Sequence, residues 1–275
     1  MMSFRKVLII GKRSILSKEL NKTIEGSLVF SSNEFETIQF YLEKYNSLNI
    51  IYNTNFKSNL LNKKDVDIIN YSNYSIHYLA QYLSLFKKFE KKINCFLFTS
   101  SCAVYGERIL ADEKDEYKIN DLYSALKASS ELMIKKYLIE TNINLIFARV
   151  FNMYSKKDNF SVISKLLDAF ENNKHFNLYN QGSNIRDFIN IKDVVNIYRL
   201  LLIKNFNGSI NISTGKGISI NEILEKSQEI FNKKLFLNNF ENSDLKICTG
   251  SNKLLTEKLG YNNFIDLFDY IKASK

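Results

Sequence analysis

The sequence predicts an α/β fold in which a parallel sheet is covered by helices on both faces. Short apolar runs alternate along the first half of the chain with longer segments of helical periodicity. The centres of the predicted strands are apolar, as expected when both faces of a parallel sheet are buried. Strand–helix alternation of this kind favours right-handed βαβ crossovers and a doubly wound sheet.

The predicted elements alternate in order along the chain. The strands are Lys6–Gly11, Leu28–Phe30, Asn49–Asn53, Asn94–Ser100 and Asn144–Val150. The helices are Ser14–Thr23, Asn33–Tyr45, Lys64–Phe89, Asp121–Glu140 and Phe160–Asn173. After about residue 152 the pattern becomes less regular. We therefore expect a smaller second lobe in the C-terminal part of the chain.

The composition bounds the class of protein. The chain has 275 residues, of which 45% are hydrophobic, and this is enough for a large core. Its formal net charge of +9 comes from scattered lysines, with no basic stripe interleaved with aromatic residues, so we expect no nucleic-acid partner. No apolar run approaches the ~18 residues of a membrane span, and the three cysteines have no metal-ligand spacing. We expect a cytoplasmic protein with no membrane contact and no bound metal.

A tyrosine and a lysine one helical turn apart follow a predicted strand that ends in hydroxyl side chains. Tyr123 and Lys127 are spaced i, i+4 and so share one helix face. An ammonium beside a phenol lowers the pKa of the phenol, and the hydroxyl of Ser101 can hold a carbonyl or alkoxide oxygen. The set suits interconversion of an alcohol and a ketone. A chain rich in Lys and Tyr also produces this spacing by chance.

The first predicted strand ends in Gly11 and a helix follows directly. This arrangement allows a tight turn and presents helix N–H groups to a pyrophosphate, although a capped helix start would show the same residues. Arg13 carries a fork of donors suited to a 2′-phosphate. The second strand runs into Ser31 with no acidic residue where NAD enzymes hold the adenosine ribose. These residues favour NADP(H) over NAD(H).

Arg186 stands next to Asp187 in a predicted half-buried strand. An adjacent Arg and Asp can form a structural ion pair. Alternatively, the bidentate guanidinium clamps a diphosphate. Both interpretations are open.

These segments follow the order of motifs in the extended short-chain dehydrogenase/reductase family of sugar-nucleotide epimerases, dehydratases and reductases, which the chain resembles over nearly its whole length. The matching segments are Ser100–Gly106, Tyr123–Lys127, Arg149–Tyr154, Arg186–Asp193 and Asn211–Ser219. The resemblance implies a Rossmann-type doubly wound parallel sheet with a smaller C-terminal substrate-binding lobe. It places a dinucleotide-binding domain at residues 1–152, with later contributions from about 186–212, and a mainly substrate-binding lobe at 153–275.

The resemblance also implies a role for each matching residue. The catalytic residues are Ser101, Tyr123 and Lys127. The cofactor-binding residues are Gly11, Arg13, Ser14, Ile15, Ser31, Thr54 and Lys127, and the substrate-binding residues are Cys102, Ala103, Asn152 and Arg186. Two segments depart from the family pattern: Ser14 and Ser17 replace glycines of G-x-x-G-x-x-G, and Tyr52–Asn55 replaces H-L-A-A.

The loop after Ser101 narrows the reaction. Dehydratases of the family carry an Asp-Glu pair where this chain has Cys102 and Ala103, and double epimerases use a Cys and a His that do not align here. Two activities remain, namely 4-keto reduction and C4 epimerisation.

We expect NADPH-dependent reduction of a nucleotide-linked 4-keto-6-deoxy sugar in surface-polysaccharide precursor synthesis. The alternatives are a C4 epimerase with bound NAD and a non-enzymatic dinucleotide-sensing protein on the same fold. The family resemblance further implies a homodimer through the helices predicted at Lys64–Phe89 and Asp121–Glu140.

Overall fold

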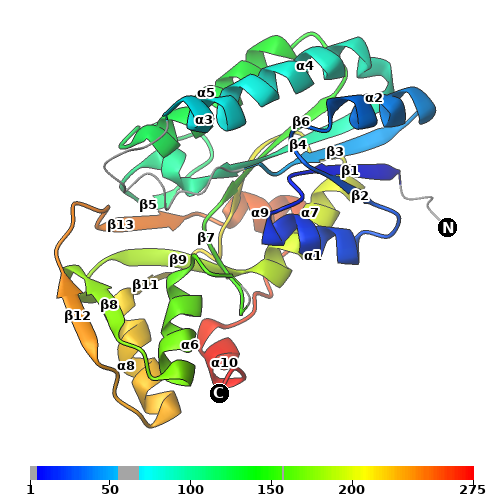
Figure 1. Ribbon diagram of the computed structural model, residues 1–275. Helices are drawn as coiled ribbons and strands as arrows, with labels where there is room; N and C mark the ends of the chain where they lie inside the picture. The colour runs from blue at the N-terminus through cyan, green and yellow to red at the C-terminus, as the bar shows by residue number, and fades with distance from the viewer. Residues whose placement is uncertain (1–4, 55–67, 157) are drawn as a thin grey trace. The chain divides into compact units, whose positions relative to one another are not determined.

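The computed structural model describes residues 5–54, 68–156 and 158–275, and the chain divides into two compact units. Figure 1 colours the chain from blue at the N-terminus to red at the C-terminus. Unit 1 consists of Met1–Val104, Ile119–Arg149 and Val195–Ile210. Unit 2 consists of Tyr105–Lys118, Val150–Val194 and Asn211–Lys275.

A six-stranded sheet forms the centre of unit 1, and its strand order is β10-β6-β4-β3-β1-β2. The strands are β1 Lys6–Ile10, β2 Leu28–Phe30, β3 Leu48–Tyr52, β4 Ile93–Ser101, β6 Asn144–Val150 and β10 Gly208–Ile212. The pairs β1–β2, β1–β3 and β3–β4 are parallel, and Leu8 lies opposite both Leu28 and Ile50. The strand order departs from sequence order, as a doubly wound sheet requires.

Helices cover both faces of this sheet. Figure 1 shows α2, α4 and α5 on one face and α1 and α7 on the other. The helices are α1 Ile15–Thr23, α2 Phe35–Lys44, α3 Ile68–Ser72, α4 Tyr78–Lys88, α5 Leu122–Tyr137 and α7 Ile191–Ile203. The predicted fold class is therefore confirmed, with the strands and helices in the expected order.

The helix predicted over Lys64–Phe89 is divided in the structure. A π-helical segment, Asn73–His77, separates α3 from α4. Its Asn-Tyr-Ser start has low helix propensity, so the regular i→i+4 ladder is weakly favoured there. Residues 64–67, which begin the predicted helix, lie outside the described residues.

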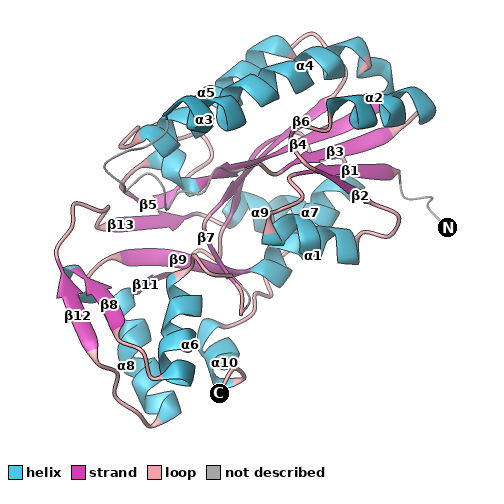
Figure 2. Cartoon of the chain, in the orientation of Figure 1, coloured by secondary structure: helices cyan, strands magenta, loops and turns pink. Residues whose placement is uncertain are grey.

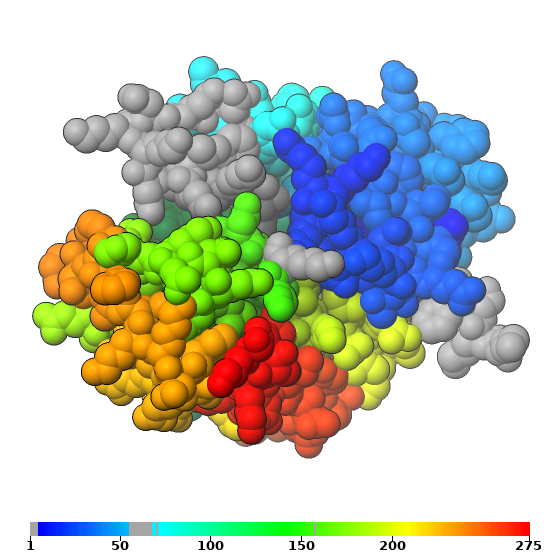
Figure 3. Space-filling view, turned by 60° about the horizontal axis from the view of Figure 1, so that its bottom comes forward, coloured from blue at the N-terminus to red at the C-terminus, as the bar shows by residue number. Residues whose placement is uncertain are grey.

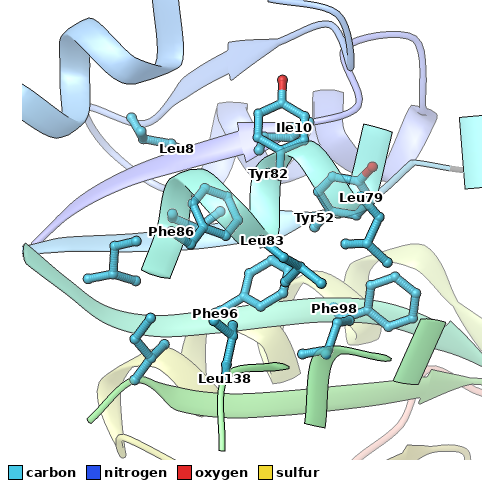
Figure 4. Packing of buried hydrophobic residues seen from close by; sticks show 14 of the residues in the cluster. Leu8, Ile10, Tyr52, Leu79, Tyr82, Leu83, Phe86, Phe96, Phe98 and Leu138 are labelled. Atoms are coloured by element: carbon cyan, nitrogen blue, oxygen red, sulfur yellow. The ribbon is translucent and has the colours of Figure 1, made fainter. Parts of the chain in front are cut away.

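A hydrophobic core of unit 1 lies between the sheet and the helices α2, α4 and α5. Figure 4 shows Tyr82 and Phe86 of α4 facing aromatic residues of β3 and β4. The ring centroids of Tyr52 and Tyr82 are 5.7 Å apart, and those of Phe86 and Phe96 are 5.2 Å apart. This aromatic layer packs one face of β4 along its length and ends at Phe98, three residues before Ser101.

Unit 2 is built on a shorter sheet of order β11-β9-β13-β5, with β7 paired to β9, and a separate β12-β8 pair; Figure 2 shows these strands in magenta. The strands are β5 Arg108–Ala111, β7 Asn152–Tyr154, β8 Phe176–Tyr179, β9 Ile185–Asn190, β11 Gly217–Ser219, β12 Leu237–Phe240 and β13 Ile247–Gly250. The helices are α6 Val162–Asn172, α8 Ile220–Phe231, α9 Lys253–Leu259 and α10 Leu267–Lys272.

The C-terminal helix of unit 2 closes a second hydrophobic core. Leu267 and Ile271 of α10 are buried together with Ile223 and Leu224 of α8. Figure 3 shows the red C-terminal residues at the surface beside the orange residues of α8. Within the part of the chain that the structure describes, no helix combines the length and apolarity needed to cross a membrane.

Candidate active site

Strand β4 delivers Ser101 to the carboxyl edge of the unit 1 sheet. The strand is buried from Cys95 to Ser100, and a 3-10 turn, Cys102–Tyr105, follows it directly. The Ser101 hydroxyl accepts a hydrogen bond of 3.2 Å from the amide of Ala103. The turn therefore fixes the serine side chain and holds Cys102 and Ala103 beside it.

Helix α5 begins with a capping box that sets the position of Tyr123. The Asp121 carboxylate accepts from the Ser124 amide at 2.7 Å, and the Ser124 hydroxyl accepts from the Asp121 amide at 3.0 Å. Tyr123 lies in this first, rigid turn. Lys127 follows on the same face one turn later, as the spacing predicts.

The structure brings Tyr123 and Ser101 together. Their side chains form a hydrogen bond, which lowers the pKa of the phenol, but burial has the larger effect and raises that pKa to about 12. The phenol therefore stays protonated at neutral pH. The expectation that Lys127 holds this pKa below its usual value differs from the structure, because the desolvation of a buried phenolate outweighs the favourable contacts.

Lys127 is held in the interior by a backbone carbonyl. Its side chain is buried, and Nζ donates a 2.8 Å hydrogen bond to the Thr99 carbonyl. The Nζ atom also lies 4.9 Å from the ring centroid of Phe98 and 5.9 Å from that of Tyr123. Burial lowers the pKa of Lys127 to about 7, against the opposing effect of Glu131. A small environmental change therefore switches its charge near neutral pH.

Tyr123 and Lys127 also line a small cavity. Its volume is about 10 Å³, and Tyr52, Thr54 and Tyr71 complete much of its wall. A polar cavity of this volume has room for about one water molecule. Thr54, which the resemblance implies as a cofactor residue, thus lies next to the candidate catalytic pair.

The turn after β1 requires glycine at Gly11. This residue has φ of +128°, and a Cβ on it would lie 2.1 Å from the Asn53 carbonyl oxygen. The turn leads through Ser14, the N-cap, into Ile15, the first residue of α1. The start of α1 therefore stays a predicted pyrophosphate site, since the N–H groups of a first helical turn have no partner within the helix.

Asn53 explains how the loop accommodates two serines in place of glycines. Its Nδ2 donates to the hydroxyls of Ser14 and Ser17, each at 2.9 Å. Ser17 is fully buried by this contact, and the Ser14 hydroxyl makes no cap hydrogen bond to the helix. Asn53 is not among the predicted site residues, although it directly follows β3, and the strand ends of parallel sheets meet at one edge.

A carboxylate lies at the end of β2, contrary to the expectation drawn from Ser31. Glu34 accepts a short hydrogen bond from the Ser31 amide. The signal in the sequence is Ser31-Ser-Asn-Glu34, the S-x-x-E pattern in which a glutamate reaches back to the first residue. Arg13 lies with its guanidinium 5.9 Å from the ring centroid of Tyr74.

In unit 2, Arg186 and Asp187 do not pair, because neighbouring side chains of a strand point to opposite faces. Arg186 instead donates to the Asp244 carboxylate at 3.0 Å and to the Leu245 carbonyl at 2.6 Å. Asp187 is fully buried and accepts from the amide and hydroxyl of Thr214. Burial raises the pKa of Asp187 to about 6.

Asn152, the other substrate residue implied in unit 2, lies at the start of β7. Its Nδ2 donates to the Asp187 carbonyl at 3.1 Å, which ties β7 to β9. Within the described ranges, no three His, Cys, Asp or Glu side chains are grouped as metal ligands.

The low pKa of Lys127 predicts how this residue's contribution to the free energy of unfolding changes with pH. Above pH ~7 the folded side chain is neutral, whereas an unfolded lysine stays charged to pH ~10.4, so the unfolded state binds more protons in this window. The contribution of Lys127 to stability therefore rises with pH between these values, by at most about 1.4 kcal/mol per pH unit.

In urea unfolding at several pH values, Lys127→Met should be most stable relative to wild type below pH ~7, and this advantage should shrink toward pH ~10. A difference that stays constant across the window would contradict the assignment. Matching far-UV circular dichroism of the two proteins is the control.

Known proteins share both the sequence pattern and the fold. A family model described as "NAD dependent epimerase/dehydratase family" matches residues 50–213. A dTDP-D-glucose 4,6-dehydratase of Dictyostelium discoideum is 27% identical over 150 residues, which are 49% of this chain and 35% of the relative. A GDP-6-deoxy-D-talose 4-dehydrogenase of Aggregatibacter actinomycetemcomitans is 32% identical over 142 residues, which are 50% of this chain and 46% of the relative. The matches thus span less than half of each curated relative.

A solved structure shows the same fold over almost the whole chain. The UDP-glucuronic acid 4-epimerase of Bacillus cereus, in complex with UDP-glucuronic acid and NAD, superimposes with a TM-score of 0.85 at 17% identity. The match covers 98% of this chain and 97% of the epimerase chain. With the family model matching more than half of the sequence, the chain belongs to the NAD dependent epimerase/dehydratase family.

Proposed function

We propose that this chain catalyses the NADPH-dependent reduction of a nucleotide-linked 4-keto-6-deoxy sugar. The observation that carries the proposal is the hydrogen bond between the Ser101 and Tyr123 side chains, with Lys127 one turn further along the same helix. A phenol that stays protonated at neutral pH is the form that a ketone reduction consumes, since it donates its proton to the developing alkoxide.

Each residue of the set has a part in the proposed reaction. Gly11, Arg13, Ser14 and Ile15 would hold a nicotinamide dinucleotide, which would supply the hydride for C4 when bound. Tyr123 donates a proton to the C4 oxygen, and Ser101 holds that oxygen in place. Lys127, with a pKa of about 7, can supply positive charge beside the phenol when it is protonated. In unit 2 we assign Arg186 and Asn152 to the nucleotide-sugar diphosphate.

The loop after Ser101 supports reduction over dehydration. Cys102 and Ala103 offer no carboxylate to remove water across C5 and C6. A relative that is 32% identical over half of this chain carries the name GDP-6-deoxy-D-talose 4-dehydrogenase, which denotes redox chemistry at C4 of a 6-deoxy sugar nucleotide.

The second candidate is a C4 epimerase that keeps NAD bound. The structural likeness to an NAD-bound UDP-glucuronic acid 4-epimerase favours it, and so does the Glu34 carboxylate at the end of β2. A dinucleotide-sensing protein without activity is less consistent with the retained Ser101, Tyr123 and Lys127.

The two activities differ in their stoichiometry. Given a 4-keto-6-deoxy nucleotide sugar and NADPH, the protein should consume ketone and cofactor one for one, followed by absorbance at 340 nm and NMR of the product. In deuterated water, C3 and C5 should remain protiated. Interconversion of two nucleotide hexoses without net cofactor use would instead establish the epimerase.

The proton donor is tested by removing one oxygen atom. Tyr123→Phe should fold normally and lose turnover by on the order of a hundredfold or more, because a positioned general acid contributes about this much. Tyr137→Phe, on the exposed end of α5, is the matched control and should keep wild-type turnover. Wild-type turnover in Tyr123→Phe would remove Tyr123 from the proposed mechanism.

The cofactor preference rests on two opposed charges near the end of β2. The Lys12 amide donates to the Phe30 carbonyl at 2.9 Å, which places the loop that carries Arg13 beside the end of β2. A cation there favours the 2′-phosphate of NADPH, and the Glu34 carboxylate opposes it.

In fluorescence titrations, NADPH should bind more tightly than NADH. Arg13→Ala should shrink this difference by roughly 1–3 kcal/mol, and Glu34→Gln should enlarge it. Equal affinities in the wild type, or shifts of the same sign in both variants, would refute the assignment.

We also propose a homodimer through the outer faces of α4 and α5. Leu132 of α5 is an exposed apolar residue on this face, with 47% of its surface accessible. Light scattering at micromolar concentration should give twice the 32.1 kDa chain mass, and Leu132→Asp should reduce it to one chain. Phe236→Asp, an equally drastic change at an exposed site of unit 2, should leave the mass unchanged. A monomeric wild type would contradict this proposal.

A further inference from the structure

A buried carboxylate lies on the same face of α5 as the candidate catalytic residues. Glu131 follows Lys127 by one helical turn and Tyr123 by two, and none of its surface is exposed. An isolated carboxylate in such a place is strongly unfavourable, so its partners define what it does.

The partners of Glu131 come from both strands that α5 covers. The Ser100 hydroxyl of β4 donates to Oε1 at 2.5 Å. Arg149 of β6 donates to Oε1 through Nε at 3.1 Å and to Oε2 through Nη2 at 2.8 Å. This is a two-pronged guanidinium–carboxylate contact in the interior, the arrangement with the most defined geometry among ion pairs.

The strand side of this contact adjoins the candidate active site. Ser100 lies between Thr99, whose carbonyl accepts from Lys127, and Ser101, whose hydroxyl bonds Tyr123. Three consecutive residues of β4 therefore contact three residues on one face of α5, and the Ser100–Glu131 hydrogen bond is the third of these contacts. The hydroxyl of Tyr198, from α7, donates to the Thr99 hydroxyl at 3.1 Å and so contacts the same part of β4.

We propose that Glu131 is a positioning residue for this site: its carboxylate fastens α5 to β4 and β6 and so fixes Lys127 and Tyr123 against Ser101. The inference deepens the proposed function, because it concerns the same three side chains. It does not depend on which sugar is reduced.

The charged groups around the Glu131–Arg149 ion pair predict how the pKa of Lys127 changes when either residue of the pair is replaced. Arg149 from β6 and Lys135 and Lys127 from α5 face Glu131, and Lys135 Nζ lies 3.7 Å from its Oε2. Lys127 itself faces Tyr123 of α5, Tyr52 of β3 and Tyr71 of α3 across the small cavity. The negative charge of Glu131 favours the ammonium form of Lys127, and the positive charge of Arg149 disfavours it.

The decisive experiment measures the titration of Lys127 by NMR of protein labelled at the lysine ε-carbon, with the resonance assigned by its loss in Lys127→Met. Glu131→Gln should move the midpoint down by about one pH unit, and Arg149→Met should move it up. The double variant Glu131→Gln/Arg149→Met should fall between them. A residue that only fills space would give no such opposed pair of shifts.

Removing the Ser100–Glu131 hydrogen bond tests positioning without changing any charge in the site. Ser100→Ala should lower kcat of the reductase assay by at least about tenfold with little change in KM, since a small misplacement of reacting groups costs that much. Glu222→Gln, which alters an exposed glutamate of α8 paired with Lys226, is the control and should match wild type.

Two results would overturn the proposal: midpoints that do not move in opposite directions in the charge variants, or unchanged kcat in Ser100→Ala. If a single charge variant fails to fold, kcat of Ser100→Ala still decides the question, because that variant changes no charge. Absence of wild-type turnover with 4-keto-6-deoxy nucleotide sugars would count against the proposed function alone, because the NMR titration needs no substrate.

Discussion

The hydrogen bond from the Lys127 ammonium to the Thr99 carbonyl is the contact on which the candidate site depends. A strand end offers few carbonyls that are not already used by the sheet ladder, and Thr99 lies where β4 is about to leave the sheet. For the lysine to reach it, α5 must lie directly on β4, with its register set within a fraction of a turn.

The capping box at Asp121 fixes the start of the helix, and Glu131 with Ser100 and Arg149 fixes its middle. The aromatic core beneath β4 makes that surface stiff enough to define the contact.

Burial shifts the pKa values of Tyr123 and Lys127 in opposite directions, and both shifts have the same physical cause. Removing water disfavours whichever form of a side chain is charged, so the pKa of Tyr123 rises while that of Lys127 falls. At neutral pH the phenol is a proton donor, and the lysine is close to its midpoint. Any anion or carbonyl oxygen that enters beside them changes this balance, because it favours the ammonium and competes for the phenolic proton. The site is therefore electrically sensitive to its ligand, which suits a step in which charge develops on oxygen.

Much of the fold and part of the site follow from local patterns in the sequence. Apolar runs such as Asn144–Val150 predict buried strands because parallel sheets expose neither face, and the Tyr123–Lys127 spacing predicts a shared helix face. Residues that act through distant partners were not predictable in this way. Asn53 bonds serines more than thirty positions away, and Glu131 meets Ser100 and Arg149 from separate strands. The pKa of Tyr123 was misjudged for the same reason, since desolvation depends on the whole surrounding core rather than on one neighbour.

The turn after β1 also bears on how this chain can vary in evolution. The chain has nine glycines among its 275 residues, and two positions of the G-x-x-G-x-x-G pattern are serines. Ser14 and Ser17 fit because Asn53 supplies a donor to each hydroxyl. Gly11 cannot be replaced in this way, because any Cβ would collide with the Asn53 backbone itself. The same asparagine thus permits two replacements through its side chain and forbids a third through its carbonyl. A chain with glycine at positions 14 and 17 has no hydroxyls there that need the Asn53 side-chain donor. Such a chain should therefore tolerate other residues at position 53.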